Sequence, residues 1–285
     1  MIVDPNAKIN LGLHVHDKGE DGFHNIETVF CPVDLTDMLE VVPSADDVFL
    51  FQSTGLPIPG DTAGNLCVKA YELMKKDHDL PAVKIHLHKT IPMGAGLGGG
   101  SADAAFMIRA LNQLFGLDLA DEKMMEYTRQ LGSDCTFFIR NKVSFGYGRG
   151  DQLEPITLDL SGYTIVVIVP LVHINTAKAY SMIDEQRAAD PAGIFRDVHK
   201  ACHLINVVES GPASWSSLVQ NDFEMPVFSA HPLLAGIKQQ MYDHGAVYAS
   251  MSGSGSAIYG VFPREMEIEK DAFGDYFFWQ GKMLE

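Results

Sequence analysis

The chain of 285 residues is long enough for one large or two ordinary domains, and its hydrophobic content of 46% is ample for buried cores. The formal net charge of −16 argues against a surface that binds nucleic acid, because phosphate backbones are held by clustered Lys and Arg. The N-terminus does not resemble a signal peptide, and every apolar run is interrupted well before about 18 residues, so we expect a cytoplasmic protein without a membrane partner.

A strand is predicted at residues 7–15, where apolar and polar residues alternate. One face would carry Ala7, Ile9, Leu11, Leu13 and Val15. The other face would carry Lys8, Asn10 and His14, which a strand taken alone could simply expose to solvent. A turn at 21–25 then leads into an extended segment at 26–30.

Two short strands are predicted at 37–42 and 48–52. A helix follows at about 63–76, with Asp61 or Thr62 as its cap. The alternation at 83–88 indicates a further strand.

The most informative stretch is residues 92–105, with five glycines among the seven residues 94–100. Glycine removes the side chains that would keep a ligand away from backbone N–H groups, and it permits positive φ angles. Apolar residues follow at helical spacing, and Ser101 and Asp103 lie where capping residues belong. Because such a loop combines free N–H donors with the positive end of a helix dipole, we predict a phosphate site.

Three other interpretations of the loop are weaker. Gly94, Gly96 and Gly99 have the dinucleotide spacing G-x-G-x-x-G, but the region about 20 positions on, where an acidic residue should end a second parallel strand, is a helix and its exit. A Walker loop ends in Gly-Lys-Ser or Gly-Lys-Thr, whereas this loop has no lysine before Ser101. A flexible linker would not be followed at once by so apolar a helix.

A helix is predicted at 121–131, closed by Gly132. Asp134 follows directly before an apolar run, and helix capping is one interpretation of its carboxylate. After a strand at 143–147, a stretch with two glycines and a proline marks a boundary. We therefore expect domains at 1–155 and 156–285.

The second domain is predicted to begin with a buried strand at 163–170 and a helix capped by Thr176. A helix at 194–208 carries His199 and His203 one turn apart. A zinc metalloprotease would have Glu directly after the first histidine, so this pair is assigned to a solvated face.

The last predicted elements are a helix at 233–244, strands at 247–249 and 258–262 around a Gly-Ser turn, and a terminal strand at 276–283. The four cysteines, at 31, 67, 135 and 202, form no C-x-x-C pair. They are expected to be reduced packing residues and not a metal site or a disulfide framework.

The glycine loop closely resembles the phosphate loop of the galactokinase, homoserine kinase, mevalonate kinase and phosphomevalonate kinase (GHMP) superfamily. Its version from Gly96 to Ala105, Gly-Leu-Gly-Gly-Gly-Ser-Ala-Asp-Ala-Ala, is similar to that of the 4-diphosphocytidyl-2-C-methyl-D-erythritol kinases of the non-mevalonate isoprenoid pathway. Motifs near residues 8, 94 and 252 follow the family's order over nearly the whole chain. The resemblance implies a GHMP-kinase-like α/β fold, of α+β type, with two lobes and an active site in the cleft between them.

Matching residues acquire roles from this resemblance. Lys8 and Asn10 match a Lys-x-Asn pair that faces the active site, and Asp134 matches a catalytic Asp that also contacts the substrate. The proline two residues after that Asp is Thr136 here. The Gly-Ser turn around Ser252 matches a third motif that supports the phosphate loop.

The remaining implied substrate contacts surround a cytosine ring. Phe23 and His24 match a Tyr-His pair that borders the ring, although Phe23 cannot donate the hydrogen bond of a phenol. Thr176 would meet the substrate, and Tyr180 would form the second wall of the sandwich or, alternatively, pack in a core. The residues assigned to the nucleotide are Asn65, near the adenosine, and Lys89, Pro92, Met93, Gly94, Ala95, Gly96, Leu97, Gly98, Gly99, Gly100, Ser101 and Ala102.

The implied reaction transfers the γ-phosphate of ATP to the 2-hydroxyl of 4-diphosphocytidyl-2-C-methyl-D-erythritol, with Asp134 as general base assisted by Lys8. Mg²⁺ is expected with ATP; its ligands are unassigned, and the Ser101 hydroxyl is a candidate ligand or a plain helix cap. The partner is a small molecule, and a monomer or weak dimer is expected. One alternative is another GHMP kinase acting on mevalonate, homoserine or a sugar, in which an aromatic sandwich would have no purpose. The other is a non-enzymatic nucleotide-binding or RNA-binding protein, whose surface should be basic.

Overall fold

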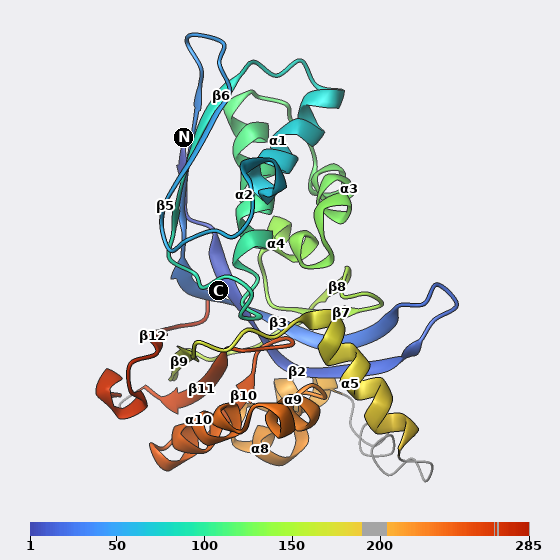
Figure 1. Ribbon diagram of the computed structural model, residues 1–285, viewed down its shortest axis with the longest axis vertical. Helices are drawn as coiled ribbons and strands as arrows, with labels where there is room; N and C mark the ends of the chain where they lie inside the picture. Colours follow the sequence, from blue (N-terminus) through green and yellow to red (C-terminus); the bar gives the residue numbers. More distant parts are fainter. Residues whose placement is uncertain (190–203, 265, 267, 285) are drawn as a thin grey trace. The chain divides into compact units, whose positions relative to one another are not determined.

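The structure is a computed structural model, and it describes residues 1–189, 204–264, 266 and 268–284 (Figure 1). The chain divides into two compact units. Unit 1 comprises residues 1–8, 34–93 and 98–142, and unit 2 comprises residues 9–33, 94–97 and 143–285. The domain boundary expected after residue 155 stays a prediction.

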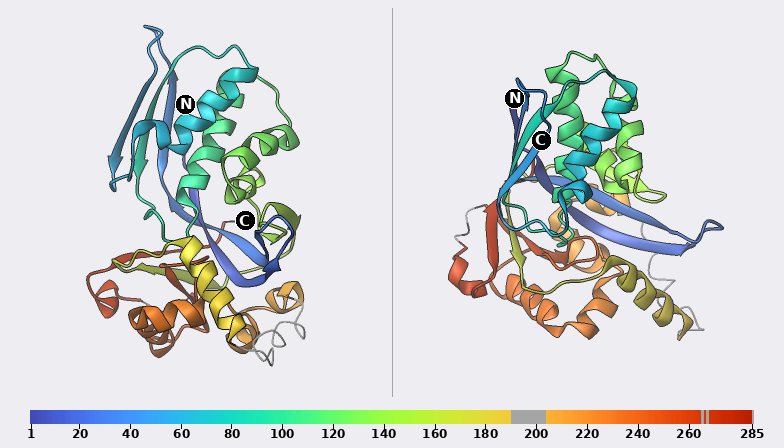
Figure 2. Two further views of the ribbon diagram at one scale, coloured as in Figure 1. Left: turned by 45° about the vertical axis from the view of Figure 1, so that its right-hand side comes forward. Right: turned by 45° about the horizontal axis from the view of Figure 1, so that its top comes forward.

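Unit 1 is built on a four-stranded sheet in the order β1 (Ile2–Val3), β4 (Met38–Pro43), β6 (Val83–Lys89) and β5 (Leu50–Gly55). Strand β6 is antiparallel to β4 and parallel to β5. One side of the sheet is covered by α1 (Leu66–Asp77), α2 (Gly99–Leu114) and α3 (Asp121–Leu131), which pack against one another (Figure 2). Three short segments complete the unit: η1 (Thr62–Gly64), η2 (Ser133–Thr136) and α4 (Phe137–Arg140).

Unit 2 contains two further four-stranded sheets. One is antiparallel, in the order β10 (Tyr248–Met251), β11 (Ile258–Pro263), β9 (Tyr163–Val169) and β12 (Phe277–Gly281). The other has the order β2 (Asn6–Lys18), β3 (His24–Thr36), β7 (Ser144–Tyr147) and β8 (Gln152–Pro155). The first three residues of β2 and the last three of β3 belong to unit 1.

The helical elements of unit 2 are α5 (Thr176–Ala188), α7 (Leu204–Glu209), η4 (Pro212–Ser214), α8 (Trp215–Leu218), α9 (Glu224–Ala230), α10 (Pro232–Asp243) and η5 (Lys270–Phe273). Its core joins apolar side chains of β2, β9, α5 and α10, among them Leu13, Val15, Val166, Ile168, Ile183, Leu234, Ile237 and Met241.

Several predicted elements are confirmed within one residue at each end. The strands at 83–88 and 163–170 are β6 and β9, and the helices at 121–131 and 233–244 are α3 and α10. The mixture of helices and sheets confirms the predicted fold class. Of the helix predicted at 194–208, the described part is the start of α7, while His199, His203 and Cys202 lie outside the described residues.

The polar face of the first strand is buried, which excludes the alternative that it is solvated. Lys8 is 3% exposed, Asn10 is 2% exposed and His14 is 4% exposed. Each therefore needs polar partners inside the protein, since an unpaired buried polar group is costly.

The capping predictions for two helices are wrong. The N-cap of α2 is Gly98, so neither Ser101 nor Asp103 caps this helix. The N-cap of α5 is Asn175, whose Oδ1 accepts from the Lys178 amide at 3.0 Å, and Thr176 is the first helical residue. Both errors place the cap after the observed one. The prediction of Asp61 or Thr62 as cap of the helix at 63–76 is also wrong, because α1 begins at Leu66 with Asn65 as its N-cap and Asp61 caps the preceding η1.

Three of the cysteines are confirmed as packing residues. Cys31, Cys67 and Cys135 are buried and form no disulfide. Burial raises the pKa of the Cys135 thiol to about 11, so this sulfur stays protonated.

A buried ion triad joins three segments of unit 1. The Lys89 ammonium at the end of β6 lies 2.7 Å from Oδ2 of Asp103 in α2 and also contacts Oδ2 of Asp37, the residue before β4. Oδ1 of Asp37 accepts from the amides of Thr90 and Ile91 at 2.6 and 2.8 Å. Asp37 thus fixes the chain that enters the glycine loop, and Asp103 fixes the helix that leaves it.

The pKa directions within the triad follow from burial and pairing. Burial opposes the charge of Lys89, but the two carboxylates outweigh it and raise the pKa of the ammonium. Burial raises the pKa of Asp103, because it penalises the charged carboxylate; the nearby Asp37 carboxylate acts in the same direction and Lys89 in the opposite one.

Replacing Lys89 with Met should lower the free energy of unfolding by about 3–5 kcal/mol, because it leaves buried carboxylates uncompensated. Urea unfolding measures this loss. The matched control is Lys84→Met on the same strand, where the ammonium pairs with exposed Asp46 at 2.9 Å and the loss should be at most about 1 kcal/mol. Equal losses in the two variants would contradict a supporting role for the triad.

Candidate active site

The glycine loop has the backbone conformation that its composition predicts. Gly94, Gly96 and Gly98 have φ angles of +69°, +82° and +72°, in the region that favours glycine. Helix α2 begins at Gly99, and its N-cap makes no side-chain hydrogen bond. The first amides of a 16-residue helix are therefore left without a side-chain acceptor, which suits an anion.

In unit 2 the first half of the loop rests on the Gly-Ser turn between β10 and β11. Ser252 Oγ donates to the Gly96 carbonyl at 2.9 Å, and the Ala257 amide donates to the Ala95 carbonyl at 3.0 Å. A Cβ at Gly96 would lie 2.0 Å from the Ser252 carbonyl oxygen, so only glycine fits. These contacts confirm the support that the resemblance implied.

In unit 1 the start of α2 rests on Lys89 and Lys8. A Cβ at Gly99 would lie 3.0 Å from the Lys89 Nζ atom, and one at Gly98 would lie 3.1 Å from Cγ of Lys8. Because the Lys89 side chain has no exposed surface, its placement favours a supporting role over the predicted contact with the nucleotide.

The other predicted nucleotide residues fall into exposed and buried positions. Met93 and Gly94 are exposed, and Pro92, Gly96, Gly98, Gly100 and Ser101 are half-buried. Ala95, Leu97 and Ala102 are buried, so their side chains anchor the loop. Asn65 is the N-cap of α1, where its Oδ1 accepts from the Cys67 amide at 2.9 Å.

Lys8 and Asp134, far apart in sequence, form an ion pair in unit 1. The Lys8 Nζ atom lies 3.3 Å from Oδ2 of Asp134, and the two side chains are 3% and 37% exposed. Asp134 lies in η2, where no side chain caps either η2 or the following α4, so the capping interpretation is wrong. The site therefore offers a partly exposed carboxylate next to a buried ammonium, an arrangement suited to proton acceptance beside a stabilised anion.

Asn10 lies in a buried hydrogen-bond network of unit 2. Its Nδ2 donates to Thr28 Oγ1 at 3.0 Å, and Thr28 donates to the Gly12 carbonyl at 2.5 Å. Its Oδ1 is 3.5 Å from Ser252 Oγ. Asn10 is thereby linked to the turn that supports the glycine loop.

Two of the three aromatic residues assigned to the cytosine ring contact one another. The rings of His24 and Tyr180 stack at 5.0 Å with an interplanar angle of 11°. His24 Nδ1 lies 2.6 Å from the His16 carbonyl, and Nε2 lies 3.2 Å from Asp184 Oδ1. Burial opposes the charge of Asp184, but the hydrogen bond from Lys18 and the His24 ring hold its pKa below the usual value.

Phe23 is 58% exposed, and its recorded partner is Arg149. The guanidinium carbon of Arg149 lies 4.0 Å from the Phe23 ring centroid, and Arg149 also pairs with Asp21 at 2.5 Å. The last predicted substrate residue, Thr176, has its hydroxyl 2.9 Å from that of Ser254 in the Gly-Ser turn.

Sequence reasoning missed five residues of these clusters: Thr28, Asp37, Asp103 as an ion-pair partner, Arg149 and Asp184. One signal was available for Asp103, since it stands four residues before Met107 and eight before Leu111, on the apolar face of α2. A carboxylate on a buried helix face needs a buried cation.

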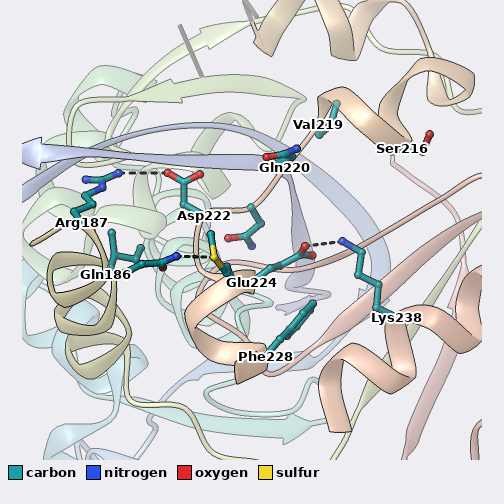
Figure 3. Close-up of a pocket in the computed structure, with 12 residues that line it drawn as sticks. Gln186, Arg187, Ser216, Val219, Gln220, Asp222, Glu224, Phe228 and Lys238 are labelled. Atoms are coloured by element: carbon teal, nitrogen blue, oxygen red, sulfur yellow. Dashed lines mark hydrogen bonds and ion pairs between the residues drawn. The ribbon is translucent and has the colours of Figure 1, made fainter. Parts of the chain in front are cut away.

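A separate pocket of about 400 Å³ in unit 2 involves none of the predicted site residues (Figure 3). The charged side chains that line it form two ion pairs. Arg187 lies 3.6 Å from Asp222, and Lys238 lies 2.5 Å from Glu224. These pairs connect α5 and α10 to the segment around α9.

No helix in the described part of the chain is long and apolar enough to span a membrane. Among the same residues, no three His, Cys, Asp or Glu side chains are grouped so that they could hold a metal ion.

Family models place both parts of the chain in one class. The model for the GHMP kinases N terminal domain matches residues 65–142, and the model for the GHMP kinases C terminal matches residues 206–273. A crystal structure of Methanococcus jannaschii mevalonate kinase shares the fold, with a TM-score of 0.72 at 14% identity over 100% of this chain and 98% of that chain. The fold and the glycine loop thus define a small-molecule kinase of the GHMP class.

Relatives narrow this class further. A protein of Bacteroides fragilis (strain YCH46) named 4-diphosphocytidyl-2-C-methyl-D-erythritol kinase is 45% identical over 99% of this chain and 100% of its own length. A crystal structure of 4-(cytidine 5'-diphospho)-2C-methyl-D-erythritol kinase has a TM-score of 0.78 at 29% identity and covers 99% of both chains. The chain belongs to the family of 4-diphosphocytidyl-2-C-methyl-D-erythritol kinases, which confirms the resemblance noted in its glycine loop.

Replacing Gly96 with Ala should abolish phosphorylation and destabilise the protein, because the new Cβ collides with the Ser252 carbonyl. Kinase activity and urea unfolding measure the two effects. The control is Gly116→Ala, which has a φ of +59° and no atom within 4 Å of the added Cβ. This control should lose only about 1–2 kcal/mol from backbone strain and keep its activity. Normal activity of the Gly96 variant would show that the loop tolerates displacement.

Proposed function

We propose that this protein transfers the γ-phosphate of ATP to the 2-hydroxyl of 4-diphosphocytidyl-2-C-methyl-D-erythritol. The observation that carries the proposal is the Lys8–Asp134 ion pair, in which a half-exposed carboxylate stands 3.3 Å from a buried ammonium. The names of the relatives supply the acceptor, and the glycine loop supports a nucleotide as the phosphate donor.

The chain's own backbone would hold the triphosphate. The proposed donors are backbone amides of residues 94–101, where the loop has positive φ angles and the start of α2 has no side-chain cap. Mg²⁺ bound with ATP neutralises phosphate charge, and it commonly needs only one or two protein ligands besides phosphate oxygens and water. The half-buried Ser101 hydroxyl, two residues into α2, is the candidate ligand from this chain.

Asp134 and Lys8 are proposed to promote the transfer of a phosphoryl group to the acceptor hydroxyl. The acceptor oxygen forms a bond to the γ-phosphorus while the bond to the ADP leaving group breaks. Asp134 takes the hydroxyl proton, and Lys8 stabilises negative charge on the attacking oxygen. A tertiary alcohol is crowded and weakly nucleophilic, so a charged pair beside it serves positioning as well as proton transfer.

Unit 2 would supply the groups that recognise the cytidine end of the acceptor. The aromatic residues proposed for this task are the stacked His24–Tyr180 pair and the exposed Phe23, and the polar ones are Thr176 and Asn10. A mevalonate, homoserine or sugar kinase would have no use for these rings. The 14% identity to a mevalonate kinase supports the common fold and nothing narrower.

The experiment that tests this function is ADP release with Mg²⁺-ATP and four acceptors: the cytidyl-diphospho-methylerythritol, mevalonate, homoserine and galactose. We expect turnover with the first acceptor alone, because only that acceptor carries a base for the aromatic residues. Turnover with another acceptor and none with the first would overturn the acceptor assignment and leave the phosphate loop in place.

Asp134→Asn should lower kcat by roughly 10²–10⁴, the range for a positioned general base, in a protein that still folds. The assay is ADP release at saturating concentrations of both substrates. Asp121→Asn serves as control, since this exposed carboxylate pairs with Arg140 at 3.6 Å and should keep full turnover. Normal kcat in a folded Asp134→Asn protein would reject the base assignment.

A further inference from the structure

The pocket of unit 2 has the size of a site for a small organic molecule (Figure 3). Its volume of about 400 Å³ falls within the range of about 300–1,000 Å³ that such sites occupy. Its walls come from α5, α8, α9, α10 and the chain between α8 and α9, all within unit 2. Because no predicted active-site residue lines it, the proposed kinase reaction does not account for this pocket.

The carboxylates of the pocket are already engaged by the protein. Glu224 Oε1 accepts from the Ser250 hydroxyl and from the Met251 amide, both at 2.8 Å, and Oε2 accepts from Lys238 Nζ at 2.5 Å. Asp222 Oδ2 accepts from a backbone amide of β2 at 2.8 Å. A carboxylate has about four acceptor positions, so Glu224 has three of them filled and offers little to a ligand that brings a proton donor.

Lys238, in contrast, keeps donors for a ligand. Its ammonium carries three N–H groups, and Glu224 is the one hydrogen-bond acceptor recorded for it in the described part of the chain. The Lys238 side chain is 25% exposed, and its Nζ lies 6.0 Å from the centroid of the Phe228 ring. Two N–H groups of this ammonium therefore remain for an oxygen of a molecule in the pocket.

The second cation of the pocket has a structural task. Arg187 lies on the opposite side of the pocket from Lys238 (Figure 3). Its guanidinium donates to the Val15 carbonyl of β2 and lies 3.6 Å from Asp222. Arg187 thus ties α5 to β2, and Lys238 is the cation that we expect to meet a ligand.

Apolar side chains supply the other part of the lining. Ile183, Val219, Met225 and Phe228 all face the pocket. Ile183 and Val219 are each 3% exposed, whereas Met225 is 47% exposed, so apolar surface is available both inside the pocket and at the protein surface. An apolar chain placed there would gain free energy by leaving water.

Charge limits the ligand to a single negative group. The lining contains two cations and two carboxylates, so its formal charge is zero, and the whole chain carries −16. One added negative charge is compensated by the remaining donors of Lys238. A multiply charged anion would lack partners and would be repelled by the acidic chain.

We propose that this pocket is a second ligand site, which binds an organic monoanion with its carboxylate at Lys238 and its apolar chain along Phe228 and Val219. The site is independent of the proposed kinase reaction. Hexanoate has both required parts and is the probe for the test.

NMR of methyl groups shows whether hexanoate binds there. We expect saturable shifts of the methyl signals of Ile183, Val219 and Met225, because these side chains line the pocket. Ile165 in β9 and Val261 in β11 are buried in the same unit but do not line the pocket, so their signals should stay in place. No shift at the three lining residues, or shifts confined to other parts of the chain, would overturn the proposal.

Two further probes test the chemical class of the ligand. Acetate keeps the carboxylate and lacks the chain, whereas 1-hexanol keeps the chain and lacks the charge. Each should bind about tenfold more weakly than hexanoate or less tightly still, because each loses one of the two contributions. Equal affinity of hexanol and hexanoate would remove the role of the charge, and equal affinity of acetate and hexanoate would remove that of the apolar wall.

Variants of Lys238 test the residue itself. Lys238→Met should raise the Kd of hexanoate about tenfold or more, while Lys238→Arg keeps a cation and should stay within about threefold. Lys270→Met, at an exposed lysine of unit 2 outside the pocket, is the control and should leave the Kd unchanged. Urea unfolding verifies that each variant folds. An unchanged Kd in folded Lys238→Met would overturn the proposal, and if that variant does not fold, the comparison of hexanoate with hexanol decides.

Discussion

The Lys89 ammonium is held between two buried carboxylates, and the arrangement of the glycine loop in unit 1 depends on this contact. Asp37 binds the amides of Thr90 and Ile91 just before the loop, while Asp103 belongs to the helix just after it. Removing a charge from water is costly, so such a group persists only where its partners are fixed. The same cost makes the triad a rigid joint between strand β6 and helix α2. A side chain at position 99 would be crowded there, because an added Cβ would lie 2.8 Å from Cγ2 of Ile91 and 3.0 Å from Nζ of Lys89.

The first half of the loop has a different kind of support. Residues 94–97 belong to unit 2, and the Gly-Ser turn holds them by two neutral hydrogen bonds to the Ala95 and Gly96 carbonyls. Both bonds use loop carbonyls as acceptors, and neither uses a loop amide. This matters because a phosphate needs donors, and a support that consumed the amides would remove the site it holds.

Local features of the site could be predicted from the sequence, and tertiary ones could not. Glycine composition and helical periodicity are properties of a short window, so the loop and α2 are visible without a structure. The Lys8–Asp134 contact joins residues far apart in sequence, and no spacing predicts it. Only the family resemblance brought those two together. Helix caps failed for a related reason: a polar residue near a helix start looks like a cap until its tertiary partner is known, as Asp103 shows.

The same argument explains why the sequence did not indicate a role for Thr28 or Arg149. A threonine in a strand is ordinary, because β-branched residues favour extended backbone, and its hydroxyl gains a role only from the Gly12 carbonyl and the Asn10 amide. Arg149 follows β7, and in sequence it is one charge in a turn, yet its guanidinium covers one face of the Phe23 ring. A base that stacks on Phe23 while Arg149 stays in place must use the other face.

A protein with a net charge of −16 can still bind a triphosphate, because the relevant donors are local. Exposed charges farther than about 10 Å are largely screened at ordinary salt, whereas the amides at the start of α2 act at contact distance. The two buried lysines, Lys89 and Lys8, have different roles. Lys89 is paired with two buried carboxylates and positions the chain on either side of the loop, while Lys8 pairs with Asp134, which is partly exposed to solvent. In the proposed reaction, Asp134 would take the proton of the acceptor hydroxyl and Lys8 would stabilise the oxygen that gave the proton away.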